Sequence, residues 1–140
     1  MPRLALIVGC ALALSGGWPY AARAVAVNGT GTAQNVPYVI GFRPLHSTQT
    51  PYVGQMHLNF NKGIISGTYT DMSVRPGSPF ANVHNAAVSG GLSGSQITFN
   101  IRQVTFRGTL TGEKMSGSAT IRGTVFTFNA QQGTPGSQQH

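Results

Sequence analysis

Apolar and polar residues alternate with a period of two through most of the chain between residues 36 and 130. Successive side chains of a strand point to opposite faces, so this alternation predicts strands with one buried face. The clearest run, residues 96–102, places Ile97, Phe99 and Ile101 on one face and polar side chains on the other. Alternating runs at the following ranges predict about eight strands: residues 36–42, 52–60, 64–70, 83–88, 96–102, 104–111, 115–122 and 126–130.

Turn residues separate these runs, and no run outside the N-terminal leader has a helical period. Residues 61–63, 89–91 and 112–114 are expected to be tight turns, and residues 71–82 the longest loop. The chain is therefore predicted to be all-β, an antiparallel meander. Such a meander of about eight strands closes most readily into a small up-and-down barrel, because closure removes exposed edges. A two-sheet sandwich is the alternative.

One short phrase recurs: an apolar residue, then Ser or Thr, then Gly. It occurs at residues 65–68, 92–95, 110–113 and 115–118. Glycine at a fixed place in an alternating run indicates a bend, a bulge or a close approach of two backbones. The repeat thus favours a strongly curled sheet.

Residues 91–99 and 106–118 resemble small exported bacterial β-barrel domains, whose strands read Gly-x-Val-x-Gly-x-x-Ile-x-Phe and Gly-Thr-x-x-Gly-x-x-Ile-x-Gly. The resemblance covers roughly residues 52–130 and implies a calycin-like shape; most members of that grouping have no known activity. Residues 67–69, Gly-Thr-Tyr, are also similar to avidin-type barrels. Because the only tryptophan, Trp18, lies in the leader, the aromatic walls of a biotin site are missing and biotin binding is not implied.

The N-terminus has the features of a secretory signal peptide. Arg3 precedes an apolar run at residues 4–14, too short to span a bilayer, and small residues at 22–26 offer cleavage after Ala24 or Ala26. Residues 7–10 resemble a lipobox, but the apolar run continues beyond Cys10, which argues against a lipoprotein. We expect a signal peptide at residues 1–24, one barrel domain at 25–130 and a disordered tail at 131–140, in a periplasmic or secreted protein without a disulfide.

Charge in the expected mature chain is scarce and mostly positive. Two acidic residues, Asp71 and Glu113, face seven basic ones, which gives a net charge of +5; the basic residues are Arg43, Lys62, Arg75, Arg102, Arg107, Lys114 and Arg122. Such a protein is attracted to polyanions, which include lipopolysaccharide, acidic glycans, nucleic acid and anionic lipid. Among these, an acidic glycan or lipopolysaccharide is favoured over nucleic acid. The alternative is that net charge only maintains solubility.

Arg102, Arg107 and Arg122 are predicted to point outward on three consecutive strands, with Arg107 and Arg122 within about two positions of each other across their pair. Clustered arginines without acidic neighbours can bind phosphate, sulfate or carboxylate groups. The alternative is an ordinary solvated face.

Tyr38, Tyr52, Tyr69 and Phe80 could instead line the mouth of the barrel and hold a small ligand. The competing interpretation is that these aromatic side chains belong to the core.

Chemistry-bearing residues are few. Paired-carboxylate catalysis would need both Asp71 and Glu113 in one cleft; His46, His57, His84 and His140 are not spaced as metal ligands; and no Gly-x-Ser-x-Gly motif is present. We therefore expect no enzyme, no metal and no cofactor. The function expected first is small-ligand binding in the barrel mouth, with polyanion binding by the outer arginines as the alternative and an enzyme ranked last.

Overall fold

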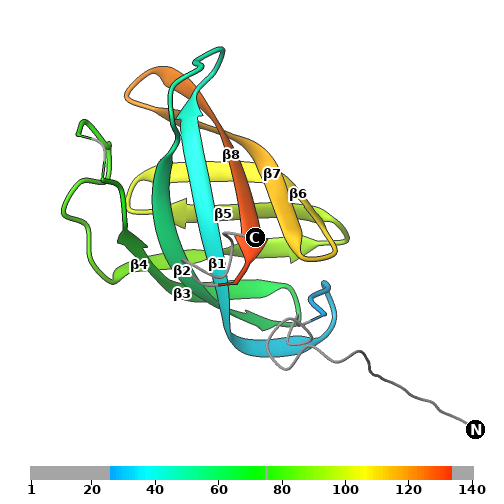
Figure 1. Ribbon diagram of the computed structural model, residues 1–140. Helices are drawn as coiled ribbons and strands as arrows, with labels where there is room; N and C mark the ends of the chain where they lie inside the picture. Colours follow the sequence, from blue (N-terminus) through cyan, green and yellow to red (C-terminus); the bar gives the residue numbers. More distant parts are fainter. Residues whose placement is uncertain (1–25, 75, 134–140) are drawn as a thin grey trace, which may run out of the picture.

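A computed structural model describes residues 26–74 and 76–133; the expected signal peptide, Arg75 and most of the expected tail lie outside this part of the chain. Eight antiparallel strands form one closed barrel in which β8 pairs back with β1 (Figure 1). The strands are β1 (Thr32–Pro44), β2 (Tyr52–Asn61), β3 (Ile64–Asp71), β4 (Ala86–Ser93), β5 (Gln96–Ile101), β6 (Val104–Thr111), β7 (Lys114–Ile121) and β8 (Thr124–Gln132). The prediction of an all-β, up-and-down barrel of calycin-like shape is confirmed, in place of the sandwich.

Three local predictions were wrong. Strand β1 begins at Thr32, because an irregularity between Ala33 and Val36 lets the polar opening segment pair with β2. The fourth strand, expected at residues 83–88, begins at Ala86, and residues 89–91, expected to be a turn, lie inside it, where Gly90 is opposite Phe99. Strand β8 continues to Gln132 and so includes the first residues of the expected tail. In each case, pairing with a neighbouring strand outweighs a weak local signal.

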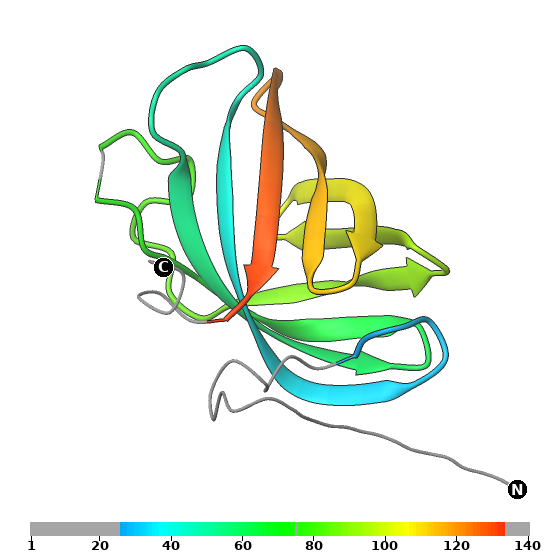
Figure 2. The same ribbon diagram turned by 45° about the vertical axis from the view of Figure 1, so that its right-hand side comes forward.

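The two ends of the barrel differ in their connections. The loop end, where β1, β3, β5 and β7 stop, carries the long connections 45–51 and 72–85 and the short turns 102–103 and 122–123 (Figure 2). The hairpin end carries two-residue turns at residues 62–63, 94–95 and 112–113, and the opening segment 26–31, whose Gly31 O accepts a hydrogen bond from Lys62 N at 2.9 Å. Nowhere in the described chain does a helix occur that is long and apolar enough to cross a membrane.

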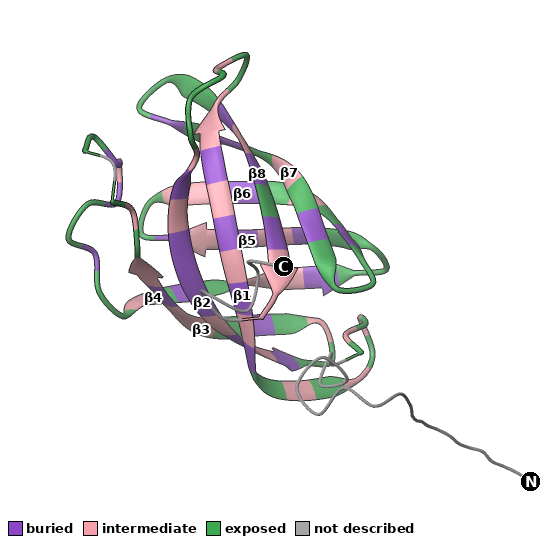
Figure 3. Ribbon diagram, in the orientation of Figure 1, coloured by how far each residue is buried: buried purple, intermediate pink, exposed green. Residues whose placement is uncertain are grey.

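The interior of the barrel is filled by side chains. Along most strands, buried residues alternate with intermediate or exposed ones (Figure 3). In β2, residues 54–56 are buried in succession. Phe106 stacks on Phe99 with ring centroids 5.0 Å apart and meets Phe128 edge-on at 5.4 Å. Its ring also lies 6.4 Å from that of Phe42, although β1 and β6 are not neighbours. Aromatic rings therefore meet across the barrel and form its core.

Inward-facing glycines let neighbouring strands approach closely. Gly108 and Gly117 lie opposite each other, and a Cβ on either would collide with the backbone of the other strand. A Cβ on Gly67 or Gly90 would collide with a backbone in the same way. The repeated phrase thus has two uses: Gly67 and Gly117 permit close approach, whereas the glycines at positions 94 and 112 occupy hairpin turns with positive φ.

Replacing Gly117→Ala should destabilise the barrel, because the new methyl group overlaps the backbone carbonyl of Arg107. Forced overpacking of this kind costs about 1–3 kcal/mol, measurable as a lower urea midpoint. Gly41→Ala is the matched control, since its Cβ would lie at an ordinary 3.5 Å from Pro51 Cβ. Equal midpoints for the two variants would contradict the close-approach role.

Candidate functional site

Three of the four aromatic residues predicted to line the barrel mouth come together at the loop end. Tyr52, Tyr69 and Phe80 gather around Phe42: the ring centroid of Phe42 lies 5.8 Å from that of Tyr52 and 5.6 Å from that of Phe80. The rings of Tyr69 and Phe80 are 5.3 Å apart. All of these side chains are buried, so they are part of the packed interior at this end.

Tyr38 lies apart from this group. Its ring packs edge-on against Phe60, with centroids 6.4 Å apart, and its hydroxyl accepts a hydrogen bond from Gln132 Nε2 at 3.5 Å. Burial raises the pKa of Tyr38 to about 12. The four residues predicted to form one ligand site are therefore divided between two places in the barrel.

Phe80 closes the loop end from the 72–85 connection. Its ring stacks on Phe106 at 6.2 Å, in addition to its contacts with Phe42 and Tyr69. The backbone around it is held by a turn in which Phe80 N donates to Ser78 Oγ at 3.2 Å and Val83 N donates to Phe80 O at 3.0 Å. An aromatic side chain from a loop thus covers the aromatic interior, with Val83 of the same loop also buried in the core.

A carboxylate fastens this loop to the barrel. Asp71 Oδ1 accepts hydrogen bonds from Tyr69 Oη (3.1 Å), Ser73 Oγ (3.2 Å) and Ser78 Oγ (3.0 Å). Asp71 Oδ2 accepts one from Ser73 N at 3.3 Å. We call these four residues the Asp71 latch. Because Ser78 also receives the hydrogen bond from Phe80 N, the latch holds the residue that covers the core.

Tyr69 is the buried member of the Asp71 latch. Burial, together with the negative charge of Asp71 and the hydrogen bond to it, raises the pKa of Tyr69 well above its usual value of about 10. The phenol therefore stays protonated and remains a donor to Asp71. Its ring lies across Gly54, where a Cβ would overlap the aromatic carbons. The sequence analysis missed the latch; an Asp followed two residues later by Ser is a turn signal that points to part of it.

The three predicted arginines are exposed, but they do not form one cluster. Arg102 and Arg122 are the first residues of two-residue turns at the loop end, with φ of 56° and 52°. Arg107 lies on the outer wall, opposite Ser118 of β7. Arg122 comes four residues after Ser118, about 13 Å along a strand. The expected spacing of about two positions is thus wrong, because the turn at 112–113 sets a different register.

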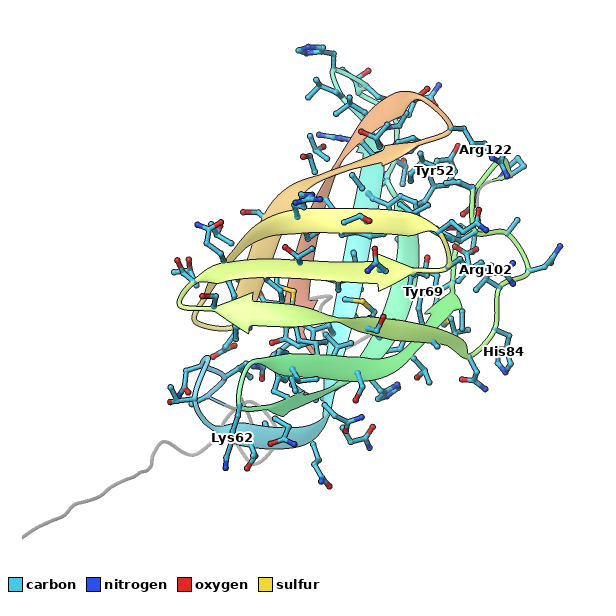
Figure 4. All side chains as sticks on the ribbon, turned by 180° about the vertical axis from the view of Figure 1, so that it is seen from behind. Tyr52, Lys62, Tyr69, His84, Arg102 and Arg122 are labelled. Carbon is cyan, nitrogen blue, oxygen red and sulfur yellow. The ribbon has the colours of Figure 1, made fainter. Side chains whose placement is uncertain are left out.

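Figure 4 shows Arg102 and Arg122 on the same side of the molecule, with His84, and Lys62 at the far end. Within residues 26–74 and 76–133, the side chains of Arg102, Arg107 and Arg122 make no hydrogen bond or ion pair. Arg43, near the end of β1, also lies at the loop end, where its Nη1 donates to Gln49 O at 3.3 Å. Among the described residues, three guanidinium groups therefore lie at the loop end.

The two carboxylates lie at opposite ends of the barrel. Asp71 is in the latch at the loop end, and Glu113 is in a turn at the hairpin end, where Oε1 accepts from Gln131 Nε2 at 3.4 Å. No three residues among His, Cys, Asp and Glu gather as a metal site in the part of the chain that the structure describes. A paired-carboxylate cleft is thus not assembled by these two groups.

A depression of about 430 Å³ lies on the outer wall where β8 passes between β1 and β7. Its lining includes Val39, Lys114, Ser116, Asn129 and Gln131. None of the residues predicted to bind a ligand or an anion contributes to it.

No known protein-family pattern matches the chain, and none of the curated proteins is significantly similar to it. The structure itself defines the class of protein: a closed, eight-stranded, up-and-down β-barrel with a filled interior and arginines at its loop end.

Replacing Asp71→Asn should lower the free energy of unfolding by about 1–3 kcal/mol. The substitution exchanges a charged acceptor for a neutral amide, to which the hydrogen bonds of the latch are weaker. Amide exchange should also increase in residues 76–85, which the latch holds. Glu113→Gln is the matched control: it removes the same charge from a solvated turn and should change stability by no more than about 0.5 kcal/mol. Similar losses in both variants would show that the latch does not hold the loop.

Proposed function

We propose that the protein is an exported, non-enzymatic β-barrel that binds polyanions, such as an acidic glycan or lipopolysaccharide, through arginines on its outer surface. The observation that carries the proposal is the absence of intramolecular partners for Arg102, Arg107 and Arg122 within residues 26–74 and 76–133. Exposed guanidinium groups without acidic neighbours are free to make paired hydrogen bonds to phosphate, sulfate or carboxylate.

The packing of the interior supports an outer-surface function. Rings from non-neighbouring strands meet across the barrel at 5.4–6.4 Å, so side chains occupy the space in which other eight-stranded barrels hold a small ligand. Export to the periplasm or the medium is supported by the N-terminal sequence, whose apolar run and small residues are typical of a signal peptide. The separation of Asp71 from Glu113 favours binding over catalysis.

The double variant Arg102→Gln/Arg122→Gln should bind heparin about tenfold more weakly at low salt, on a loss of roughly 0.7 kcal/mol per exposed charge. The matched control is Lys62→Gln/Lys114→Gln, which removes the same charge from the hairpin end. Affinities measured at two salt concentrations should differ most for the parent, because screening weakens exposed charges. Arg107→Gln tests whether the arginine on the wall takes part. If both double variants bind heparin equally weakly, net charge alone accounts for the binding, and a specific site at the loop end is rejected.

A second candidate, binding of a small ligand in the barrel mouth, rests on one observation: a single loop-borne ring, that of Phe80, covers the aromatic residues at the loop end. If the 72–85 connection moved away, Tyr52 and Tyr69 would become accessible together.

For this second candidate, at least one member of a panel of small aromatic and lipid-like compounds should raise the melting temperature of the parent protein. Tyr52→Phe should reduce that shift, whereas Tyr38→Phe should leave it unchanged because Tyr38 lies apart. The absence of any shift across the panel would reject binding in the mouth.

A further inference from the structure

Large apolar side chains are exposed mainly at one end of the barrel. Four of the five in the described chain lie at the loop end: Leu45 (46% exposed), Met72 (45%), Val74 (100%) and Val125 (43%). The fifth, Ile64 (66%), lies at the hairpin end. We call the four residues at the loop end the apolar tips.

Backbone hydrogen bonds fix where the apolar tips lie. Leu45 N donates to Val125 O at 2.8 Å, which joins the connection after β1 to the start of β8. Met72 N donates to Val53 O at 2.8 Å, so the path leading to Val74 starts from the rim of β2. The tips therefore project from the rim itself, on both long connections and on the adjoining strand.

The same rim carries positive charge. Arg43, Arg102 and Arg122 lie there, and in Figure 4 Arg102 and Arg122 occupy one side of the molecule. Asp71, the one carboxylate of the described loop end, is used by the hydroxyl groups of Tyr69, Ser73 and Ser78. Its oxygens are thus occupied by neutral donors of the latch and make no ion pair with the described arginines, and the outer rim combines exposed apolar groups with guanidinium groups.

The core does not account for this combination. The barrel is closed and its interior is filled without the apolar tips, which remain in water in the isolated chain. A soluble polyanion would pair with the arginines and leave the apolar tips exposed. An anionic lipid surface lowers the free energy of both the apolar tips and the arginines, because apolar side chains enter the headgroup region while basic ones contact phosphates.

We propose that the loop end docks on an anionic lipid surface, with the apolar tips between the headgroups and Arg43, Arg102 and Arg122 against lipid phosphates. This inference rests on the proposed function, because it uses the same arginines, and it names the carrier of the negative charge as a lipid layer. The hairpin end, with Lys62, Lys114 and Glu113, faces away from that layer.

The first test is sedimentation of the full chain with vesicles of phosphatidylcholine, with and without phosphatidylglycerol. Leu45→Ser/Val74→Ser should lower binding to the anionic vesicles about tenfold and leave heparin binding unchanged. Ile64→Ser, the matched control at the hairpin end, should change neither. Residues 4–14 are present in every variant, so any binding through them is the same in the parent, the serine variant and the control.

The arginine variant distinguishes this inference from the proposed function. Arg102→Gln/Arg122→Gln should weaken binding to both heparin and vesicles, by about fivefold per arginine on the vesicles. If the arginine variant loses both activities while the serine variant loses neither, the ligand is a soluble polyanion and the lipid inference is overturned. If the arginine variant loses neither activity, the proposed function fails.

A second readout locates the contact directly. Val74→Trp places a fluorophore on a fully exposed tip, and its emission, taken as the difference from the parent, should shift to the blue on anionic vesicles and be quenched by brominated lipid. Ile64→Trp should show no such shift. Emission of the Val74→Trp variant that is the same with and without vesicles would overturn the docking geometry, whatever the total binding.

Discussion

Closure of the sheet with so few strands is the constraint on which the rest of this structure depends. A sheet that curls this tightly brings the backbones of neighbouring strands together on the inside, where a Cβ would not fit. Glycine satisfies the constraint at Gly67, Gly90, Gly108 and Gly117. Once the sheet is closed, the inner space is narrow enough for rings from non-neighbouring strands to touch, as Phe42 and Phe106 do. The aromatic core is thus a consequence of closure.

The arrangement of charge follows from how the loop end is covered. The long connection after β3 has to be held over the aromatic interior. Its aromatic residue, Phe80, lies in a loop, so strand pairing does not fix its position. The carboxylate of Asp71 supplies the anchor, through hydroxyl groups of the strand and of the loop. Because neutral donors occupy the oxygens of Asp71 and Glu113 lies at the other end, neither carboxylate forms an ion pair with the described arginines of the loop end.

The sequence predicted the strands well because alternation records which face is buried, and a meander of about eight strands favours closure into a barrel. It predicted less where the deciding contact is distant along the chain. Gly90 and Gly91 look like a turn until Phe99 of the next strand is placed beside them. The register that separates Arg107 from Arg122 depends on the length of one turn. Likewise Ser78, in a loop rich in Pro and Gly, has no periodicity to show that it reaches Asp71.

A closed barrel with a filled interior restricts where a partner can bind. Within the described residues every strand pairs with a neighbour on each side, so no strand offers a full-length edge to another chain. The outer wall consists mostly of short polar side chains of Ser, Thr and Asn, and the guanidinium group of Arg107 lies isolated among them. The two ends of the barrel remain as places for a partner to bind, and they differ. Two-residue turns connect the strands at the hairpin end, while the loop end has long connections, exposed apolar side chains and arginines. Since neither the core nor the closure of the sheet requires these features at the loop end, binding is the function that best accounts for them.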